Sequence, residues 1–378
     1  MNGGSLGTPR RTLGLIVNPT AGMGGSVGLK GTDGEEILAR ARALGAAPIA
    51  PARAMEALRE ILPMRDEVEL FTSQGDMGED EARACGFEPM VVGSARSGRT
   101  TADDTRSDAR EMLRRGVSLL LFAGGDGTAR DIHEAVRDRL PVLGIPTGVK
   151  MHSGVLAINP RTAGSLAVRF LQGKVGVCRG EVMDIDEEAF RHGRLSARLY
   201  GYLNIPCDRR MVQNVKIGSV ATEREAPEGI AWHIIDGMED DCLYIVGPGT
   251  TTKAIMEKLG LEYTLLGVDV IHRGEIEALD VNESRLMGIV RGDKAKIIVS
   301  VIGGQGFIFG RGNQQISPQV IRLVGRENII IVATESKIVS LKGSPLLVDT
   351  GDGAVDGMLR GYMRLVTGYG KSIIYKVS

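Results

Sequence analysis

A glycine-rich turn follows an apolar run at Leu119–Ala123 and precedes a segment with helical character. The residues of the turn that could do chemistry are Gly124, Gly125, Asp126, Gly127 and Thr128. Glycines at a helix start leave backbone N–H groups accessible, and the helix dipole favours an anion there, so the pattern predicts phosphate binding. A carboxylate beside a phosphate is repelled unless it binds a metal, orients a hydroxyl or removes its proton. Asp126 is therefore predicted to take part in the chemistry.

A second glycine-rich loop comes after the first expected strand, Leu13–Val17, and begins with Asn18. Its glycines at 22, 24 and 28 do not have the spacing of the dinucleotide pattern G-x-G-x-x-G. Two interpretations stay open for this segment: a phosphate-binding loop to which Asn18 contributes, or a flexible turn.

Two more strand ends carry polar residues. Thr147, Gly148 and Lys150 follow the strand at Pro141–Ile145, and Lys150 either meets a phosphate or is a solvated surface lysine. His152, close behind, is predicted to be a satisfied polar residue near a helix start and not a base. The last loop contains Gly249, Thr250, Thr251 and Thr252. Its hydroxyl and N–H groups suit a phosphate or a ribose, although threonines are also ordinary helix N-caps.

Strands and helices alternate through the first half of the chain. The expected strands are Leu13–Val17, Glu67–Phe71, Pro89–Val92, Leu119–Ala123 and Pro141–Ile145, and the expected helices are Glu35–Leu44, Arg53–Leu62, Glu79–Cys85, Asp103–Arg114, Thr128–Val136 and Gly164–Leu171. This order predicts an α/β fold with an open, mostly parallel sheet, whose ligands bind beyond the carboxyl ends of the strands. Asn18 and Asp126 lie at such ends, and one crossover would bring Thr147, Gly148 and Lys150 near Asp126.

The pattern changes between about Val175 and Asp236. The segments Arg198–Ile205 and Val212–Gly218 alternate as strands do, which indicates an antiparallel insert or the start of a second domain. Further expected strands are Cys242–Val246, Leu265–Val270, Lys296–Val301, Asn328–Ala333 and Ser372–Val377, with helices ending near Leu259 and spanning Pro318–Val324. We therefore expect an N-terminal α/β nucleotide-phosphate-binding domain over residues 13–172. A mixed β and α/β domain over residues 173–378 would complete a cleft. The segment Gly303–Asn313 is either a loop that closes this cleft or a bulged strand and turn.

Composition narrows the class of protein. The 378 residues include 46 Lys and Arg against 47 Asp and Glu, so no basic surface for nucleic acid or an acidic membrane is predicted. The four cysteines form no C-x-x-C pair and have no histidine at metal-ligand spacing, which indicates reduced thiols. No apolar run is long enough for a membrane span, and the N-terminus has no signal-peptide pattern. These features predict a cytoplasmic protein with small-molecule partners.

The motifs together resemble a known family. Gly124–Thr128, with Asn18-Pro19 before it and Pro146-Thr147-Gly148 after it, is similar to the ATP-NAD kinase superfamily. The segments Gly247–Thr252 and Ile302–Gln315 resemble its AcoX-like branch. The sequence departs from the family's pattern in two places, and both concern the acceptor site. The family's Asn-Glu pair has no counterpart near the glycine-aspartate loop, the late dipeptide Asn282-Glu283 being a coincidence, and the threonine loop matches the family's Thr-Gly-Ser-Thr segment only approximately.

The resemblance implies a phosphotransferase. Transfer would run from ATP, with Mg²⁺ bridging phosphate oxygens, to a hydroxyl that Asp126 deprotonates, and the favoured acceptor is the 2′-hydroxyl of NAD. The residues implied in nucleotide binding are Asn18, Gly124, Gly125, Gly127, Thr128, Thr147, Gly148, Lys150, Gly249, Thr250, Thr251 and Thr252; no protein ligand for the metal is assigned. Two alternatives remain, a kinase for another metabolite or lipid hydroxyl and a non-catalytic nucleotide sensor. The resemblance also implies a homo-oligomer.

Overall fold

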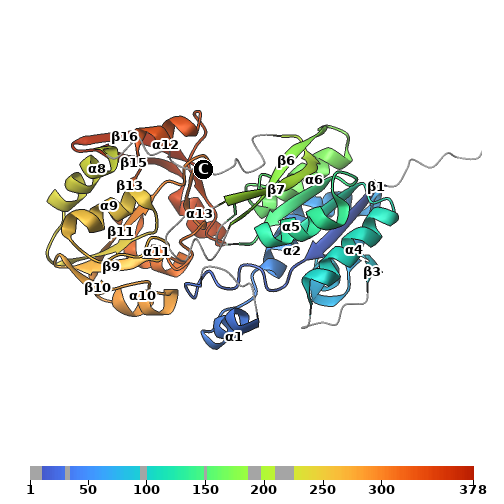
Figure 1. Ribbon diagram of the computed structural model, residues 1–378, viewed down its shortest axis with the longest axis horizontal. Coiled ribbons are helices and arrows are strands. Elements are labelled where there is room, and N and C mark those ends of the chain that lie inside the picture. The colour runs from blue at the N-terminus through green and yellow to red at the C-terminus, as the bar shows by residue number, and fades with distance from the viewer. Residues whose placement is uncertain (1–10, 30–34, 94–99, 149–150, 186–196, 209–224) are drawn as a thin grey trace, which may run out of the picture. The chain divides into compact units, whose positions relative to one another are not determined.

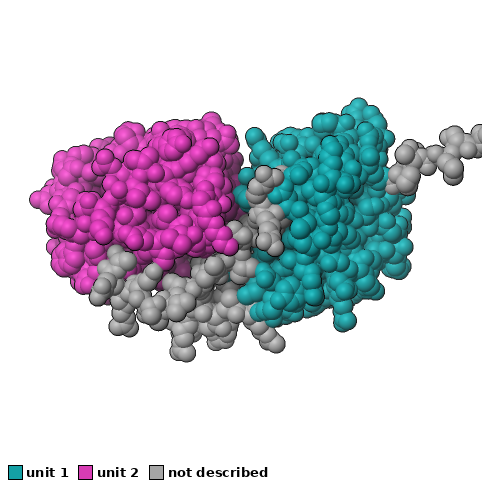
Figure 2. Space-filling view, turned by 90° about the horizontal axis from the view of Figure 1, so that it is seen from above, with its two compact units in different colours: residues 1–22, 48–215 teal, residues 23–47, 216–378 magenta. Residues whose placement is uncertain are grey.

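The computed structural model describes residues 11–29, 35–93, 100–148, 151–185, 197–208 and 225–378. The chain divides into two compact units (Figure 2), residues 1–22 with 48–215 and residues 23–47 with 216–378. The domain boundary expected between residues 172 and 173 stays a prediction. Lys150 and the strand expected at Val212–Gly218 lie outside the described residues.

The first unit is built on a parallel sheet with strand order β3-β2-β1-β4-β5 (Figure 1). Its strands are β1 (Arg11–Val17), β2 (Val68–Ser73), β3 (Met90–Val92), β4 (Leu119–Gly124) and β5 (Val142–Pro146). All six residues of β4 are buried, as the uninterrupted apolar run predicts for a central parallel strand. The sequence therefore predicted the sheet type and each of its strands.

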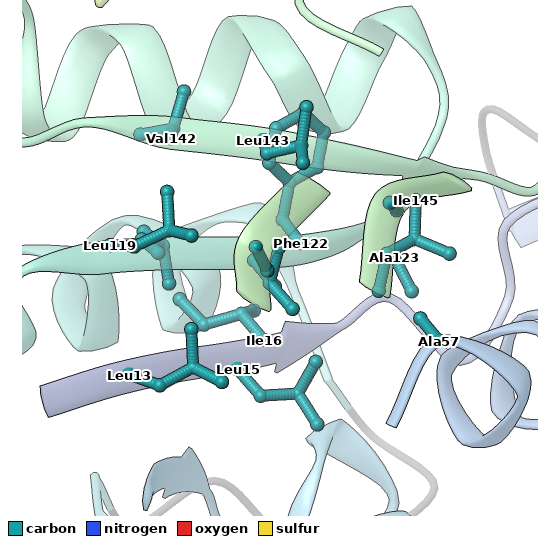
Figure 3. Close-up of a cluster of buried hydrophobic side chains, with 14 of the residues drawn as sticks. Leu13, Leu15, Ile16, Ala57, Leu119, Phe122, Ala123, Val142, Leu143 and Ile145 are labelled. Carbon is teal, nitrogen blue, oxygen red and sulfur yellow. The ribbon is translucent and has the colours of Figure 1, made fainter. Parts of the chain in front are cut away.

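Helices cover both faces of this sheet. They are α2 (Ala50–Ile61), α3 (Glu79–Ala84), α4 (Ala102–Arg114), α5 (Asp126–Val136) and α6 (Pro160–Leu171), with short 3₁₀ turns η1 (Leu62–Glu67) and η2 (Gly75–Met77). Helix α2 packs on α6, and α4 packs on α5. Side chains such as Leu15, Phe122 and Leu143 fill the space between helices and sheet (Figure 3). This core fixes the strand ends from which the loops emerge.

An antiparallel hairpin, β6 (Val177–Ile185) and β7 (Ala197–Pro206), also belongs to the first unit. Both of its strands contact α5, and β7 approaches this helix so closely that a Cβ at Gly201 would overlap the ring of His133. The predicted antiparallel insert therefore exists, but it packs against the glycine-aspartate helix, and its first strand was not predicted.

The second unit contains a mixed sheet of seven strands in the order β10-β9-β8-β11-β13-β15-β16. Its strands are β8 (Cys242–Val246), β9 (Asp269–His272), β10 (Glu275–Ala278), β11 (Lys294–Ser300), β13 (Ile329–Val332), β15 (Gly361–Gly368) and β16 (Lys371–Val377). Strands β8, β11, β13 and β15 run parallel, whereas β9 pairs antiparallel with β8 and β10, and β16 with β15. The predicted fold class, α/β with a further antiparallel portion, is confirmed.

Two buried clusters cover the two faces of this second sheet. Tyr244 and Ile298 point into one cluster, whereas Ile245 and Ile297 point into the other, as the two-residue period of a strand requires. The helices of this unit are α1 (Glu35–Ala43), α8 (Glu225–Asp236), α9 (Thr250–Leu259), α10 (Glu283–Ile289), α11 (Pro318–Val324), α12 (Glu335–Ser340) and α13 (Gly353–Leu359), with a 3₁₀ turn η3 at Arg326–Asn328. Helix α8 was not predicted; it packs on α9 and β15.

The prediction of a strand at Leu265–Val270 is wrong in its bounds, because β9 begins only at Asp269. The carboxylate of Asp269 is 2% exposed and accepts hydrogen bonds from the N–H and hydroxyl of Thr264 and from the N–H of Asp280. The segment before Asp269 is therefore tied into a loop by a side chain, and its apolar residues do not join the sheet.

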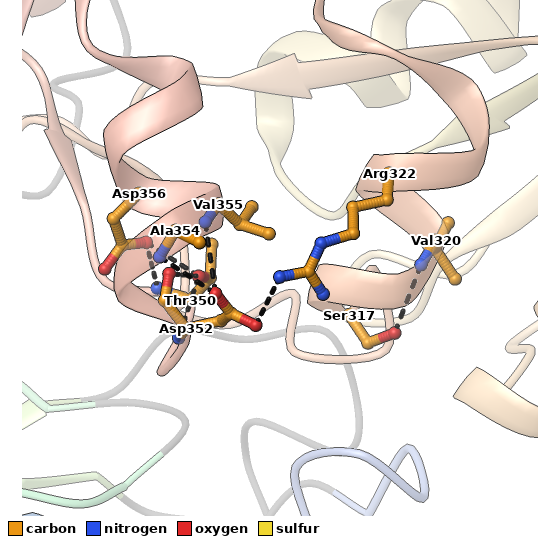
Figure 4. A network of polar contacts seen from close by, with 8 residues as sticks. All are labelled: Ser317, Val320, Arg322, Thr350, Asp352, Ala354, Val355 and Asp356. Atoms are coloured by element: carbon orange, nitrogen blue, oxygen red, sulfur yellow. Dashed lines mark hydrogen bonds and ion pairs between the residues drawn. The ribbon is translucent and has the colours of Figure 1, made fainter.

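A polar network joins α11 to the start of α13 (Figure 4). Asp352 caps α13 by accepting the N–H groups of Ala354 and Val355, and Arg322 of α11 donates to its other oxygen. The Arg322 guanidinium lowers the pKa of Asp352, and these N–H groups add to the effect. The network therefore ties α11 to the connection from β13 to β15, in which α13 lies.

The segment Gly303–Asn313 forms a strand and turns, which was one of the two alternatives. Strand β12 (Phe307–Phe309) pairs in parallel with β14 (Leu347–Val348), with a shift of register between the two ends. The buried guanidinium of Arg311 lies 3.1 Å from the carboxylate of Asp349. Since Asn313 also bonds the backbone of Ile308, side chains of the segment hold it in place.

None of the four cysteines forms a disulfide. Within the described part of the chain, no helix combines the length and apolar character that crossing a bilayer requires. The expectation that the cysteines form no disulfide therefore agrees with the structure.

Glu81 of α3 is a buried carboxylic acid, 4% exposed, and one of its oxygens has no partner among the residues that the structure describes. Burial raises the pKa of Glu81 from the ordinary 4.5 to about 7, and the negative charges of Asp80 and Asp76 add to this. Between these values the folded protein holds a proton that the unfolded chain has released. The free energy of unfolding must therefore fall as the pH rises through this window.

We expect Glu81→Gln to flatten this fall by on the order of 2 kcal/mol between about pH 5 and pH 8. Urea unfolding of both proteins at several pH values measures the effect. Glu79→Gln is the matched control: the N–H of Gly75 lowers the pKa of Glu79, so that variant should keep the fall. If Glu81→Gln had the wild-type slope, the titration would belong to another acid such as Asp108, whose pKa burial also raises.

Candidate functional site

The loops after β1 and β4 leave the sheet side by side at their carboxyl ends, because these two strands are neighbours. The strand order reverses between them, which is where open α/β sheets bind ligands. Asn18 Nδ2 donates to Thr128 Oγ1 at 3.0 Å, and Asn18 Oδ1 accepts from the hydroxyl and N–H of Thr20. Asn18 and Thr128 therefore hold the two loops to each other.

Asp126 is the first residue of α5 and is 8% exposed. Its Oδ2 accepts the backbone N–H of His152 at 2.8 Å, and its Oδ1 accepts the N–H of Ser153 at 3.0 Å. The carboxylate thus fixes the loop that follows β5 against the start of α5. The sequence placed Asp126 at the helix start, but it gave no sign of these two contacts.

Backbone contacts hold the loop after β5 against the loops after β1 and β4. The N–H of Thr147 bonds the carbonyl of Gly124, and an added Cβ at Gly125 would lie 4.0 Å from the Cα of Gly148. Gly22 has φ +79°, and a Cβ there would overlap the carbonyl oxygen of Thr147. The structure therefore brings together Asn18, the Gly124–Thr128 loop, Thr147 and Gly148, as the predicted crossover requires.

Two buried side chains of the loop after β5 lack partners. Thr147 is 2% exposed, and its hydroxyl makes no hydrogen bond to a described residue. The same holds for both ring nitrogens of His152, which is 4% exposed. The prediction that His152 is a satisfied polar residue is therefore wrong within the described residues, because sequence position does not reveal what surrounds a ring.

The threonine loop of the second unit lies at the start of α9. Gly249 has φ +133° and ends the connection from β8, Thr250 is exposed, and Thr251 and Thr252 are each 1% exposed. Thr252 donates its hydroxyl to the carbonyl of Gly249, and no described side chain caps the first N–H groups of α9. These four residues lie together as predicted, but in a unit separate from Asp126.

A lysine that sequence analysis missed contacts this second loop. Lys337 Nζ donates to Thr251 Oγ1 at 2.8 Å and to Ser300 Oγ at 2.7 Å. Thr251 follows β8, Ser300 ends β11 and Lys337 follows β13, and these three strands are adjacent and parallel. The available signal was that Lys337 comes soon after a predicted strand end. An ammonium group beside two hydroxyls and a helix start suits an anionic ligand.

The dipeptide Asn282-Glu283, which was expected to match the family's Asn-Glu pair only by coincidence, has a structural role. Asn282 caps α10 by accepting the N–H of Arg285, and the N–H of Glu283 bonds the carbonyl of Ser26. The dipeptide thus starts a helix and holds the loop segment after Met23.

No group of three or more acidic, histidine or cysteine side chains that could hold a metal ion occurs among the described residues. A Mg²⁺ ion carried on nucleotide phosphates keeps several waters and needs few protein ligands. No protein ligand is therefore assigned to such an ion.

Comparison with known families identifies both halves of the chain. Residues 13–175 match the ATP-NAD kinase N-terminal domain, and residues 239–377 match the ATP-NAD kinase C-terminal domain. No curated protein sequence matches the chain. Because the two domains of one family follow each other in order and cover well over half of its length, the chain belongs to the ATP-NAD kinase family.

Proposed function

We propose that the protein is a kinase that transfers the γ-phosphoryl group of ATP to a hydroxyl, and that its acceptor is the 2′-hydroxyl of NAD, giving NADP. The family supports a kinase of the NAD kinase type. The observation that carries the proposal is the meeting of three loops around the start of α5, with Asp126 at their centre.

The N-terminal turn of α5 supplies the phosphate site in this proposal. The first backbone N–H groups of a helix have no intrahelical partner, and Gly125 and Gly127 leave the approach to them open. An added Cβ at Gly127 would meet no other atom within 4 Å. Gly124, Thr128 and Asn18 hold this turn in place, and Thr147 and Gly148 complete the rim; Lys150, outside the described residues, is proposed from the sequence alone to meet a phosphate.

Asp126 is proposed to orient the acceptor hydroxyl and take its proton. Phosphoryl transfer depends mostly on positioning and charge neutralisation, which glycine loops at helix starts supply with few side chains. Mg²⁺, when bound through phosphate oxygens, would neutralise part of their charge. In the second unit, Gly249, Thr250, Thr251 and Thr252, together with Lys337 and Ser300, are proposed to hold an anionic part of one nucleotide.

Three finer points belong to the same proposal. The segments Gly247–Thr252 and Ile302–Gln315 favour the AcoX-like branch of the family. A cytoplasmic location is proposed because none of the four cysteines forms a disulfide. A homo-oligomer is proposed from the resemblance, and sedimentation of the purified protein would test it.

The test is product identification. We expect purified protein with ATP, Mg²⁺ and NAD to form NADP, detected by chromatography, and 2′-deoxy-NAD to bind as a competitor without giving product because it lacks the nucleophile. Inorganic polyphosphate replaces ATP in a second arm to identify the donor. Phosphorylation of a different hydroxyl from a metabolite panel would overturn the NAD assignment. Nucleotide binding with no product from any acceptor would support a sensor instead.

A further inference from the structure

His152 is a buried side chain to which the proposed chemistry assigns no role. Its ring is 4% exposed, and neither nitrogen has a hydrogen-bond partner among the described residues. Buried polar groups in folded proteins are nearly always paired, so an unpaired one calls for an explanation such as a role in catalysis. The ring lies beside the carboxylate at the centre of the candidate site.

The backbone and the ring of His152 both lie against the carboxylate of Asp126. Nδ1 of His152 lies 3.4 Å from Oδ2 of Asp126, and the backbone N–H of the same histidine donates to the same oxygen at 2.8 Å. The neighbouring N–H of Ser153 holds the other oxygen at 3.0 Å. These two bonds hold the backbone of His152 and Ser153 at the carboxylate, and burial confines the ring beside it, with Nδ1 and Oδ2 as neighbouring atoms.

Asp126 is the only acid within ion-pairing distance of the His152 ring in the described part of the chain. It belongs to α5, which the loop packs against. On the hairpin side, the loop bonds backbone groups of β6: Ser153 Oγ contacts the N–H and carbonyl of Met183, and the N–H of Gly154 bonds the carbonyl of Glu181. Lys150 lies outside the described residues.

A buried carboxylic acid formed during turnover needs an outlet for its proton. Asp126 is 8% exposed, and both of its oxygens already accept backbone N–H groups. Nδ1 of His152 is the described acceptor placed to receive a proton from Oδ2. An imidazole takes up and releases protons near neutral pH, which suits it to that task.

We propose that His152 receives the proton that Asp126 takes from the acceptor hydroxyl; this rests on the proposed function. The hydroxyl O–H bond breaks and its proton goes to Asp126, while the acceptor oxygen bonds to the γ-phosphorus. The bond from that phosphorus to the leaving oxygen breaks, and its electron pair stays on the leaving phosphate. The proton then moves from Asp126 Oδ2 to Nδ1 of the neutral imidazole, which later releases it to water. His152 thus acts through Asp126.

The test measures kcat and KM between about pH 5 and pH 9 for wild type, His152→Gln and His133→Gln. If the relay operates, we expect the wild-type kcat to fall toward the acid end of this range, because a protonated imidazole accepts no further proton. We expect His152→Gln to lower kcat on the order of 10²-fold with little change in KM for ATP, and to lose that acid fall. His133, from the helix that Asp126 begins, is the control histidine and should keep the wild-type profile. A purely structural role would lower the melting temperature and leave the shape of the profile unchanged.

A second readout does not depend on the His152 variant folding. The ring ¹⁵N signals of His152, titrated with pH by NMR, should change between wild type and Asp126→Asn if the groups are paired. Signals that ignore this substitution would overturn the pair. An active His152→Gln with the wild-type kcat and profile would overturn the relay alone, whereas a wild-type protein that phosphorylates no hydroxyl would overturn the relay together with the proposed function.

Discussion

Asp126→Asn should reduce turnover by on the order of 10²–10⁴-fold, because an amide does not accept the proton of the acceptor hydroxyl. Binding of ATP should remain, since the backbone N–H groups at the start of α5 stay in place. The structure shows that the substitution should also lower the stability of the fold, which the sequence did not reveal. An amide has one acceptor oxygen, so its NH₂ group must face the N–H of either His152 or Ser153, which costs about 1–3 kcal/mol.

Three measurements separate these effects: the rate of product formation, ATP affinity by calorimetry, and the melting temperature. Asp131→Asn is the matched control, because Asp131 is a buried acid of the same helix that pairs with Arg106. Burial raises the pKa of Asp131, and the charge of Arg106 opposes the rise. The control should lose stability and keep kcat. A full wild-type rate in Asp126→Asn would remove the carboxylate from the mechanism and leave it only the role of holding the loop.

Gly127→Ala should weaken ATP binding at least tenfold, about 1.4 kcal/mol, without destabilising the fold. The added methyl would meet no protein atom within 4 Å, and alanine inside a helix is favoured over glycine by about 1 kcal/mol. A loss of affinity in a protein of equal or greater stability can then come only from a ligand that needs the open approach to this turn.

Gly124→Ala serves as the comparison, because it should destabilise the fold whereas Gly127→Ala should not. A Cβ at Gly124 would overlap the side chain of Thr128, whose hydroxyl accepts from Asn18. Overpacking of this kind costs about 1–3 kcal/mol, so a lower melting temperature is expected. Calorimetry with ATP and thermal unfolding on both variants decide the matter. Unchanged ATP affinity in Gly127→Ala would mean that the Gly124–Thr128 segment is an ordinary turn.

The sequence alone determined the elements whose signals are local. An unbroken apolar run, three glycines and an acid specify strand, turn and helix at Leu119–Val136 whatever surrounds them, and β8 and α11 begin and end at the expected residues. Alternation of such units fixes parallel strands with right-handed crossovers, so the meeting of three strand-end loops followed from the order of elements. Helix α8 and strand β6 lacked a signal of that kind.

Contacts between distant residues were decided only by the tertiary structure. The bond from His152 to Asp126 spans 26 positions and that from Lys337 to Thr251 spans 86, and no spacing rule reaches so far. Whether a histidine is satisfied, or a glycine lies in open space, depends on which atoms packing brings within a few ångströms of it. The Gly124–Thr128 loop could therefore be found in the sequence, whereas the partners of Asp126 and the unpaired ring of His152 required the folded chain.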